Sequence, residues 1–128
     1  MQYLLDTHVL IWWITSDQRL STKARALIAS HRNTLHWSVA SSWEISIKHA
    51  LGRLVFDEPP EVLIPKELDH NRIETLLIDN AHAFAAGQLP LHHKDPFDRM
   101  LVAQARTESL GIVSNDSALG LYDVDVFW

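Results

Sequence analysis

The feature that most constrains the fold of this chain is the alternation of strand-like and helix-like segments along its length. Short apolar runs, such as those at 34–38 and 111–114, are separated by longer stretches in which apolar residues recur at helical spacing. Strands that alternate with helices favour a parallel sheet with helices on both faces. We therefore predict an α/β protein, a three-layer α/β/α domain with a central, mainly parallel sheet.

The pattern places the individual elements along the chain. Ser21 is expected to cap the second helix and Gly52 to end the third, in which Val39, Trp43 and Ile47 share one apolar face. The chain contains no repeat, low-complexity tract or linker, so residues 1–128 are expected to form a single domain. Strands are expected at 2–6, 34–38, 72–78, 111–114 and 124–128, helices at 7–15, 20–32, 39–52, 80–89 and from about 96, and a loop entering a short helix at 56–68.

Composition limits the chemistry that the chain can perform. The absence of cysteine excludes disulfides, thiolate zinc sites and cysteine nucleophiles, and it fits a reducing cytoplasm. The net charge of −5 disfavours binding of nucleic acid through a broad basic surface, because such binding depends on Lys and Arg neutralising phosphates. The apolar stretch near the N-terminus is too short to span a bilayer and does not resemble a signal peptide. We expect a cytoplasmic protein with no membrane partner.

Four of the acidic residues stand out by their positions relative to the expected elements. Asp6 and Asp116 follow strands, and ligands of open parallel sheets bind beyond the carboxyl ends of the strands. Glu44 lies within an apolar helix, which is an unfavourable place for a charge. Asp98 lies in the first turn of the helix that begins near residue 96.

Each of these acids also has a purely structural explanation. Asp6 and Asp116 could cap a helix or a turn, Glu44 could face water, and Asp98 could form a capping box with Asp95. Together they are harder to explain in this way, since carboxylates that converge without cationic partners repel one another and raise at least one pKa. A divalent cation would supply the missing charge, and oxygen-only ligation favours Mg²⁺ or Mn²⁺ over zinc.

These residues occur in motifs that resemble the PIN-domain ribonucleases, specifically the VapC-type toxins of bacterial type II toxin–antitoxin pairs. The motifs are LLDTHVLIWW, ASSWEISIKHALGRL, HHKDPFDRMLVAQA and IVSND, and their order and spacing cover nearly the whole chain. The resemblance implies a metal-dependent endoribonuclease with one or two Mg²⁺ or Mn²⁺ ions. Its catalytic and metal-binding acids would be Asp6, Glu44, Asp98 and Asp116, and nothing at these positions departs from the family pattern.

The same resemblance implies a PIN-like fold and a set of partners. The first strand would lie beside the strand at 111–114, which would bring Asp6 and Asp116 together. The substrate would be RNA, cut by in-line attack of water to leave 5′-phosphate and 3′-hydroxyl ends. Toxins of this type usually form homodimers and are held inactive by a cognate antitoxin, so growth inhibition would be relieved by that partner.

Residues beside the acids are candidates for supporting roles. Asp95 is assigned as the N-cap of the helix that begins near residue 96 and is placed outside the metal site. Lys94 and Arg99 could contact RNA phosphates, or could be solvated side chains at a helix start. Thr7 and Ser114 could orient water or a ligating carboxylate, or could be simple capping hydroxyls.

The neighbouring histidines and tryptophans are expected to have mainly structural roles. His92 and His93 are close in sequence to the acids and could contact RNA, but their spacing does not match a zinc motif, and both are expected to lie in an exposed loop. His8 is expected to line or pack against the site without ligating a metal. Trp12 and Trp13 point about 100° apart on one helix, so both could be core, and an exposed one would mark an interface.

Other phosphate-handling proteins fit the sequence less well. A receiver-type phospho-acceptor domain would use Asp79, but it needs a lysine after the last strand, which is absent. A haloacid-dehalogenase-type phosphatase needs an aspartate two residues after Asp6, where His8 stands. Four scattered glycines cannot form a phosphate loop. A catalytically inactive version of the fold that binds RNA or a protein stays open, although all four acids are present.

Overall fold

The computed structural model describes residues 1–128, and every strand and helix expected from the sequence is present. One short 3₁₀ helix, η1 (Ser117–Leu121), was not expected. The strands are β1 (Gln2–Leu5), β2 (Thr34–Ser38), β3 (Glu74–Leu76), β4 (Gly111–Val113) and β5 (Val126–Phe127). The α-helices are α1 (Thr7–Ile14), α2 (Thr22–Ala29), α3 (Val39–Ala50), α4 (Pro60–His70), α5 (Asn80–Gln88) and α6 (Pro96–Glu108).

The strands form one parallel sheet in the order β3-β2-β1-β4-β5. The chain builds the sheet outward from β1 to β3 and then crosses to the other side of β1 at β4, so the switch in strand order lies between β1 and β4. Leu5 pairs with Val113, and the backbone N–H of Asp6 donates to the carbonyl of Val113 at 3.0 Å. The expected neighbourhood of the first strand and the strand at 111–114 is confirmed.

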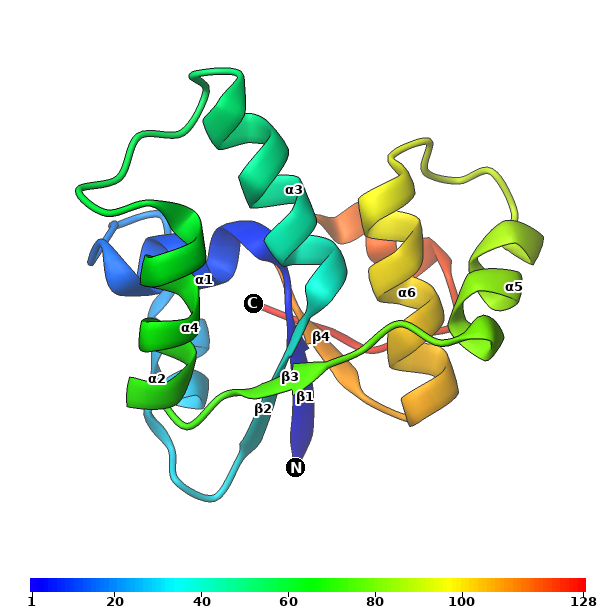
Figure 1. The fold of residues 1–128 in the computed structure, drawn as a ribbon. Helices are drawn as coiled ribbons and strands as arrows, with labels where there is room; N and C mark the ends of the chain where they lie inside the picture. Colours follow the sequence, from blue (N-terminus) through cyan, green and yellow to red (C-terminus); the bar gives the residue numbers. More distant parts are fainter.

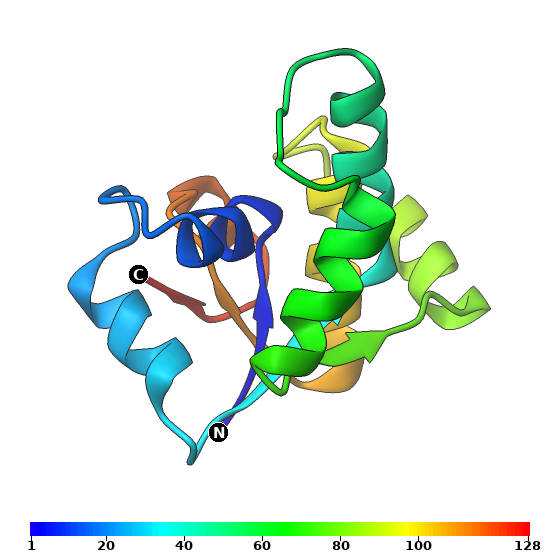
Figure 2. The same ribbon diagram turned by 60° about the vertical axis from the view of Figure 1, so that its left-hand side comes forward.

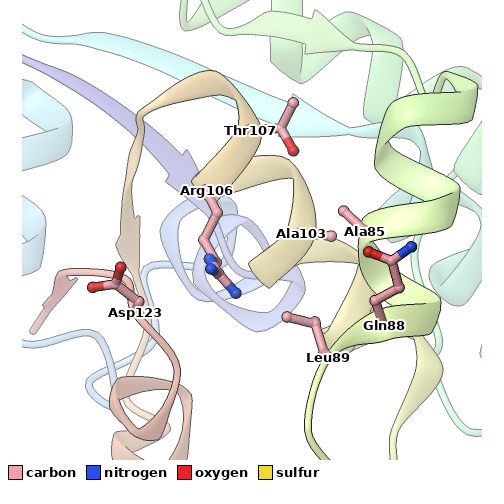
Figure 3. Close-up of a pocket in the computed structure, with 7 residues that line it drawn as sticks. All are labelled: Ala85, Gln88, Leu89, Ala103, Arg106, Thr107 and Asp123. Carbon is pink, nitrogen blue, oxygen red and sulfur yellow. The ribbon is translucent and has the colours of Figure 1, made fainter.

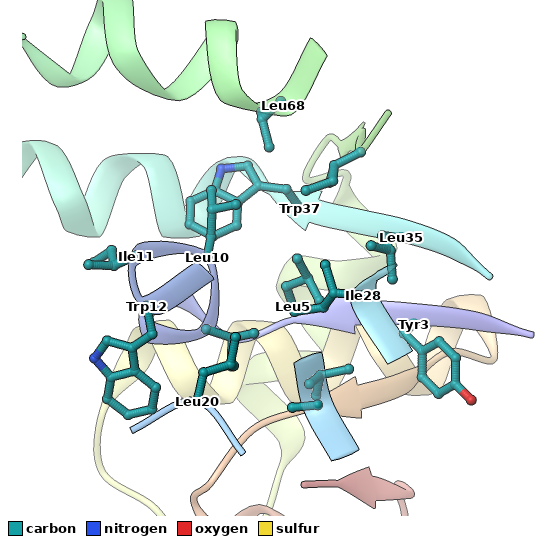
Figure 4. Packing of buried hydrophobic residues seen from close by; sticks show 14 of the residues in the cluster. Tyr3, Leu5, Leu10, Ile11, Trp12, Leu20, Ile28, Leu35, Trp37 and Leu68 are labelled. Carbon is teal, nitrogen blue, oxygen red and sulfur yellow. The ribbon is translucent and has the colours of Figure 1, made fainter. Parts of the chain in front are cut away.

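Helices cover both faces of the sheet, with α1, α2 and α4 on one side and α5 and α6 on the other (Figures 1 and 2). Side chains of β1 alternate between these faces, as the two-residue period of a strand requires. Tyr3 and Leu5 belong to a cluster of 16 buried residues with α1, α2 and α4 (Figure 4). Leu4 belongs to a second cluster of 10 buried residues with α6. The predicted three-layer α/β/α fold is confirmed.

The adjacent tryptophans of α1 are both part of the core. Trp12 is buried, and Trp13 is partly buried against the same cluster. The indole N–H of Trp13 donates to Asn71 Oδ1 at 3.0 Å, which satisfies its polar edge. Neither tryptophan therefore marks an exposed interface. No helix of the structure is both long and apolar enough to span a bilayer.

The helix α3 turns an unexpected face to the interior. It ends as predicted, with Gly52 just beyond it in the left-handed region at φ +72°. An apolar stripe ordinarily faces the core, yet Trp43 is 64% exposed and Ile47 is also exposed. The side of α3 that packs inward carries Ala40, Ser41, Glu44 and Ile45, of which only Ile45 is a large apolar side chain. The predicted apolar stripe of this helix therefore lies at the surface, and the buried Glu44 follows Trp43 about 100° further round the helix.

The strand expected at 72–78 is shorter than predicted. Only Glu74–Leu76 forms β3, because Arg72 adopts a left-handed conformation at φ 55° that a strand cannot contain. β3 is also an edge strand that pairs with β2 alone.

Candidate active site

The four predicted acids come from four parts of the chain that meet at the carboxyl edge of the sheet. Asp6 follows β1 directly, and Asp116 follows β4 at the start of η1. Glu44 lies on the inward face of α3, and Asp98 lies in the first turn of α6. The switch in strand order therefore places the first two acids at the point where open parallel sheets bind ligands.

Asp6 is held by a hydroxyl from the neighbouring strand end. Only 6% of this residue is exposed, and the Ser114 hydroxyl donates to its Oδ2 at 2.6 Å. Ser114 in turn accepts a hydrogen bond of 3.0 Å from the backbone N–H of Asp116. Asp6 occupies the N-cap position of α1, but its carboxylate accepts no capping hydrogen bond there. Helix capping therefore does not explain this aspartate.

Burial raises the pKa of Asp6 above its usual range. The hydrogen bond from Ser114 and the charge of His8 oppose this rise, and the negative charge of Glu44 adds to it. His8 itself is exposed, and its ring lies 5.8 Å from that of Trp12. His8 thus packs beside the site without entering it.

Glu44 is buried and held by two different partners. It is 5% exposed, its Oε1 accepts from the Thr7 hydroxyl at 2.7 Å, and its Oε2 lies 2.6 Å from Lys48 Nζ. The Thr7 hydroxyl also lies 2.8 Å from the Ser41 hydroxyl. Because a hydroxyl has one proton, Thr7 donates to Glu44 and accepts from Ser41. Thr7 therefore orients a carboxylate of the site and does not serve merely as a cap.

The two remaining acids share one histidine. His93 Nε2 lies 3.0 Å from Asp116 Oδ2 and 3.2 Å from Asp98 Oδ2. The other oxygen of Asp116, Oδ1, accepts from the Ala118 N–H at 3.0 Å. Asp116 thus caps η1 with one oxygen and faces the site with the other.

The carboxyl of Asp98 has a strongly raised pKa. Burial, then the negative charges of Asp6 and Asp95, raises the pKa of Asp98 to about 7. The neighbouring His93 lowers this pKa, and the negative charge of Glu44 raises it further. The negative charge of Glu44 acts on both Asp6 and Asp98, and that of Asp6 acts on Asp98, so these carboxylates lie in one electrostatic environment.

Two residues of the site were not identified from the sequence. His93 was expected in an exposed loop, but it is partly buried and faces two acids. Lys48 was not singled out, although its position four residues after Glu44 is the spacing at which helical side chains form ion pairs. The expectation that the acids converge without cationic partners was therefore incomplete.

The other predicted residues at this edge have different surroundings. Asp95 is the N-cap of α6, as predicted, because its Oδ1 accepts from the N–H groups of Phe97 and Asp98 at 2.8 and 3.4 Å. The Lys94 side chain is exposed, so it is accessible to a ligand. Arg99 does not face the acids, because its guanidinium donates to the backbone carbonyls of Ala86, Leu89 and Pro90 at 2.9 to 3.0 Å. It joins the end of α5 to α6.

A cavity of about 550 Å³ lies away from the acids, between α5, α6 and the C-terminal segment (Figure 3). It contains Arg106 and Asp123 but none of the four acids. Its lining residues are Ala85, Gln88, Leu89, Ala103, Arg106, Thr107 and Asp123.

The acid-rich edge of the sheet has the donors that a hard divalent cation requires. Ligand atoms of His93, Asp98 and Asp116 lie within 4.8 Å of one another, a spacing that a single ion can bridge. The raised pKa values of Asp6 and Asp98 indicate that negative charge is costly there, since burial and neighbouring carboxylates disfavour the ionised forms. A bound cation would remove this cost. The residues present therefore fit a Mg²⁺ or Mn²⁺ site.

Comparison with known proteins agrees with this geometry. The family model of the PIN domain matches residues 3–125. Ribonuclease VapC16 from Mycobacterium tuberculosis is 35% identical over 60 residues, which cover 47% of this chain and 43% of that protein. The matched stretch thus spans less than half of the relative's length.

Solved structures of similar fold include toxin–antitoxin complexes. VapBC2 from Rickettsia felis, bound to a DNA fragment from its promoter, superposes with a TM-score of 0.74 at 17% identity, over 99% of this chain and 98% of that one. DNA-bound VapBC from Salmonella typhimurium gives a TM-score of 0.71 at 18% identity, over 99% and 97% of the two chains. At these identities the likeness establishes the fold alone.

Proposed function

The chain belongs to the PIN domain family, and on that premise we propose that it is a metal-dependent endoribonuclease that hydrolyses RNA phosphodiester bonds. The observation that carries this proposal is the gathering of Asp6, Glu44, Asp98 and Asp116 at the switch point of the sheet. The similarity to Ribonuclease VapC16 supports the choice of RNA as substrate.

The four carboxylates would hold one or two Mg²⁺ or Mn²⁺ ions. Their oxygen-only donor set suits these hard cations, and the high pKa of Asp98 is the response expected of a carboxyl that lies among other acids. When bound, such an ion would activate water and offset the charge that develops on the phosphoryl group.

The other residues of the site would fix the carboxylates and receive the substrate. Ser114 holds Asp6 and Thr7 holds Glu44, each through a hydroxyl bond of 2.6 to 2.7 Å, so neither carboxylate is free to rotate. Lys48 Nζ lies at the edge of the site on a side chain that is 30% exposed, and could contact an RNA phosphate. With the exposed Lys94, it would provide local attraction for RNA in a chain whose net charge is −5.

A cleavage assay on total RNA tests this chemistry. The wild-type protein should cut RNA with Mg²⁺ or Mn²⁺, stop when EDTA is added, and leave 5′-phosphate and 3′-hydroxyl ends. Asp6→Asn should lose cleavage while its circular dichroism spectrum stays that of a folded protein. Asp69→Asn is the matched control, because it makes the same change at an exposed position of α4. A folded Asp6→Asn variant that cuts RNA at the wild-type rate would exclude Asp6 as a catalytic residue. A wild-type protein that binds RNA without cutting it would be an inactive binding protein.

We further propose that the protein is the toxin of a VapC-type toxin–antitoxin pair. The similar VapBC structures carry this proposal, since those proteins are toxin–antitoxin complexes. Induced expression should arrest growth, the Asp6→Asn variant should not, and co-expression of a small neighbouring antitoxin gene should restore growth. Continued growth with the active enzyme present would contradict the toxin role without affecting the ribonuclease assignment.

The exposed face of α3 supports a homodimer. Trp43, Ile47 and Leu51 are exposed there, and the ring of Trp43 lies 5.4 Å from that of Phe97 on α6. Contiguous exposed apolar side chains of this kind mark interaction surfaces. Sedimentation of the wild type and of Trp43→Ser should show a dimer for the first and a shift toward monomer for the second. A monomeric wild type would exclude the homodimer.

A further inference from the structure

The imidazole of His93 is oriented by hydrogen bonds on both of its nitrogens. Nε2 faces Asp116 and Asp98, whereas Nδ1 lies 3.2 Å from the backbone N–H of Asp95. A backbone N–H can only donate, so Nδ1 is an unprotonated acceptor. The ring proton therefore lies on Nε2, and His93 presents an N–H group to the two carboxylates.

This tautomer is the opposite of the one that a metal ligand requires. A histidine that ligates through Nε2 donates its Nδ1–H to a carbonyl, carboxylate or water behind it. Behind His93 stands a donor, the Asp95 N–H, so Nε2 has no free lone pair for a cation. Although the positions of His93, Asp98 and Asp116 could enclose an ion, the hydrogen bonding of His93 argues against ligation by its ring.

The loop that carries His93 is anchored on both sides of this ring. The His93 backbone N–H donates to Tyr122 Oη at 2.9 Å, and the Tyr122 hydroxyl donates to the Pro90 carbonyl at 2.9 Å. Tyr122 itself is buried. The ring is therefore held in place from the loop side, and a ligand of the carboxylates has to displace it against these contacts.

We propose that His93 is a positioning residue that competes with the divalent cation for Asp98 and Asp116. This inference rests on the proposed metal-dependent function and concerns how that site fills. The Nε2–H group faces Oδ2 of Asp98 and Oδ2 of Asp116, and a lone pair that accepts from this N–H would not be free for a cation. By mass action, the site fills at a higher metal concentration than the four acids alone would require.

Titration of the purified protein with Mn²⁺, without RNA, tests the competition. His93→Asn removes the donor at Nε2 but retains an amide oxygen that can accept from the Asp95 N–H, so it should bind Mn²⁺ about tenfold more tightly than wild type. His93→Gln places an amide N–H near the former Nε2 and should bind close to wild type. His31→Asn is the matched control, because it makes the same change at an exposed position in the turn before β2.

The outcomes separate this inference from the proposed function. If neither wild type nor His93→Asn binds Mn²⁺, both the metal-dependent function and the competition are wrong. If wild type binds Mn²⁺ and His93→Asn binds it equally or more weakly, only the competition is wrong. Long-range ¹H–¹⁵N NMR of the wild type gives a second readout that needs no variant: a proton on His93 Nε2 supports the inference, and a proton on Nδ1 overturns it.

Discussion

The candidate site consists of two pairs of acids that are held in different ways. The inner pair, Asp6 and Glu44, is buried at 6% and 5% exposure, and hydroxyls of Ser114 and Thr7 hold it from adjacent elements of the core. The outer pair, Asp98 and Asp116, has side chains that are 19% and 35% exposed and that share His93 from a loop.

Because of this difference, we expect the two pairs of acids to have different roles in the site. Residues fixed by buried hydrogen bonds lose little freedom when a ligand arrives, so the inner pair is organised before any cation binds. The outer pair contacts His93, and this side chain has to move away, or share its carboxylate acceptors, when a cation binds. The inner pair should therefore determine whether the site works, and the outer pair should determine the conditions under which it fills.

The strongest test of this comparison is the loss of one acid from each pair. We expect Asp6→Asn to reduce RNA cleavage by more than about a hundredfold, which exceeds the roughly 10- to 100-fold cost of losing a partner behind a metal ligand. Asp116→Asn should have a smaller effect, because the amide oxygen can still cap η1. Cleavage rates measured at saturating Mn²⁺ give the comparison. Equal losses in the two variants would remove the distinction between the pairs.

The second test removes the hydroxyl that links the two pairs. Ser114→Ala deletes the buried donor to Asp6 and the partly buried acceptor of the Asp116 N–H. We expect Mn²⁺ affinity to fall roughly 10- to 100-fold and the free energy of unfolding to fall by about 1 to 2 kcal/mol. Calorimetric titration and urea unfolding measure these quantities. Ser46→Ala on the exposed side of α3 should change neither, and a similar effect of both variants would contradict the role of Ser114.

The third test uses the pH dependence of stability in EDTA. The pKa of Asp98 is about 7 in the folded protein against an ordinary value of 3.8, so the folded state binds the proton more tightly. Its contribution is favourable at low pH and is lost as the pH rises from about 4 through 7. Asp98→Asn should remove this loss and, because the side chain is partly solvated, stabilise the protein at pH 8 by only about 1 kcal/mol.

Urea unfolding at pH 5 and pH 8 measures the effect of this substitution. Wild type should lose stability between the two pH values, and Asp98→Asn should lose less, with the remaining slope due in part to the raised pKa of Asp6. The same ionisation should make Mn²⁺ bind more tightly as the pH rises, because the carboxylate is the ligand form. A variant with an unchanged pH slope would show that Asp98 does not titrate near neutrality.

The smallest expected effect concerns the cation of the inner pair. Lys48→Met removes the charge that lies 2.6 Å from Glu44, and should lower the free energy of unfolding in EDTA by about 1 kcal/mol, because Lys48 is partly exposed. The loss should shrink when Mn²⁺ is present, since the ion can replace the missing charge. Thermal unfolding with and without Mn²⁺ checks this, and an equal loss in both conditions would show that the ion does not neutralise Glu44.

Much of the fold was predictable because it depends on signals between residues close in sequence. Short apolar runs and helical spacing located every strand and α-helix, and local chemistry located the cap at Asp95 and the helix end at Gly52. The positions of Asp6 and Asp116 after strands were also readable, since a parallel sheet places strand ends at one edge. The 3₁₀ helix η1 was missed because it is short and lacks a periodic apolar pattern.

The partners of the acids were decided by tertiary structure. Ser114 and Asp6 are 108 positions apart in sequence and meet only because β4 inserts beside β1. The burial of Glu44 could not be predicted from the apolar stripe of its own helix, because it depends on how α3 packs against α1, α4 and α6. The partners of Arg99 could not be predicted from the sequence either, because its carbonyl acceptors belong to the end of α5 and the loop that follows.

The sequence by itself thus determined the α/β architecture, the family resemblance and the identity of the four candidate acids, because patterns and motifs consist of residues that are close in sequence. Only the tertiary structure decided that His93 faces these acids, that it presents Nε2–H to them, and that Arg99 does not reach them. The physical reason is that hydrogen bonds and charge effects act over a few ångströms in space. Spacing along the chain does not fix which groups come within that range.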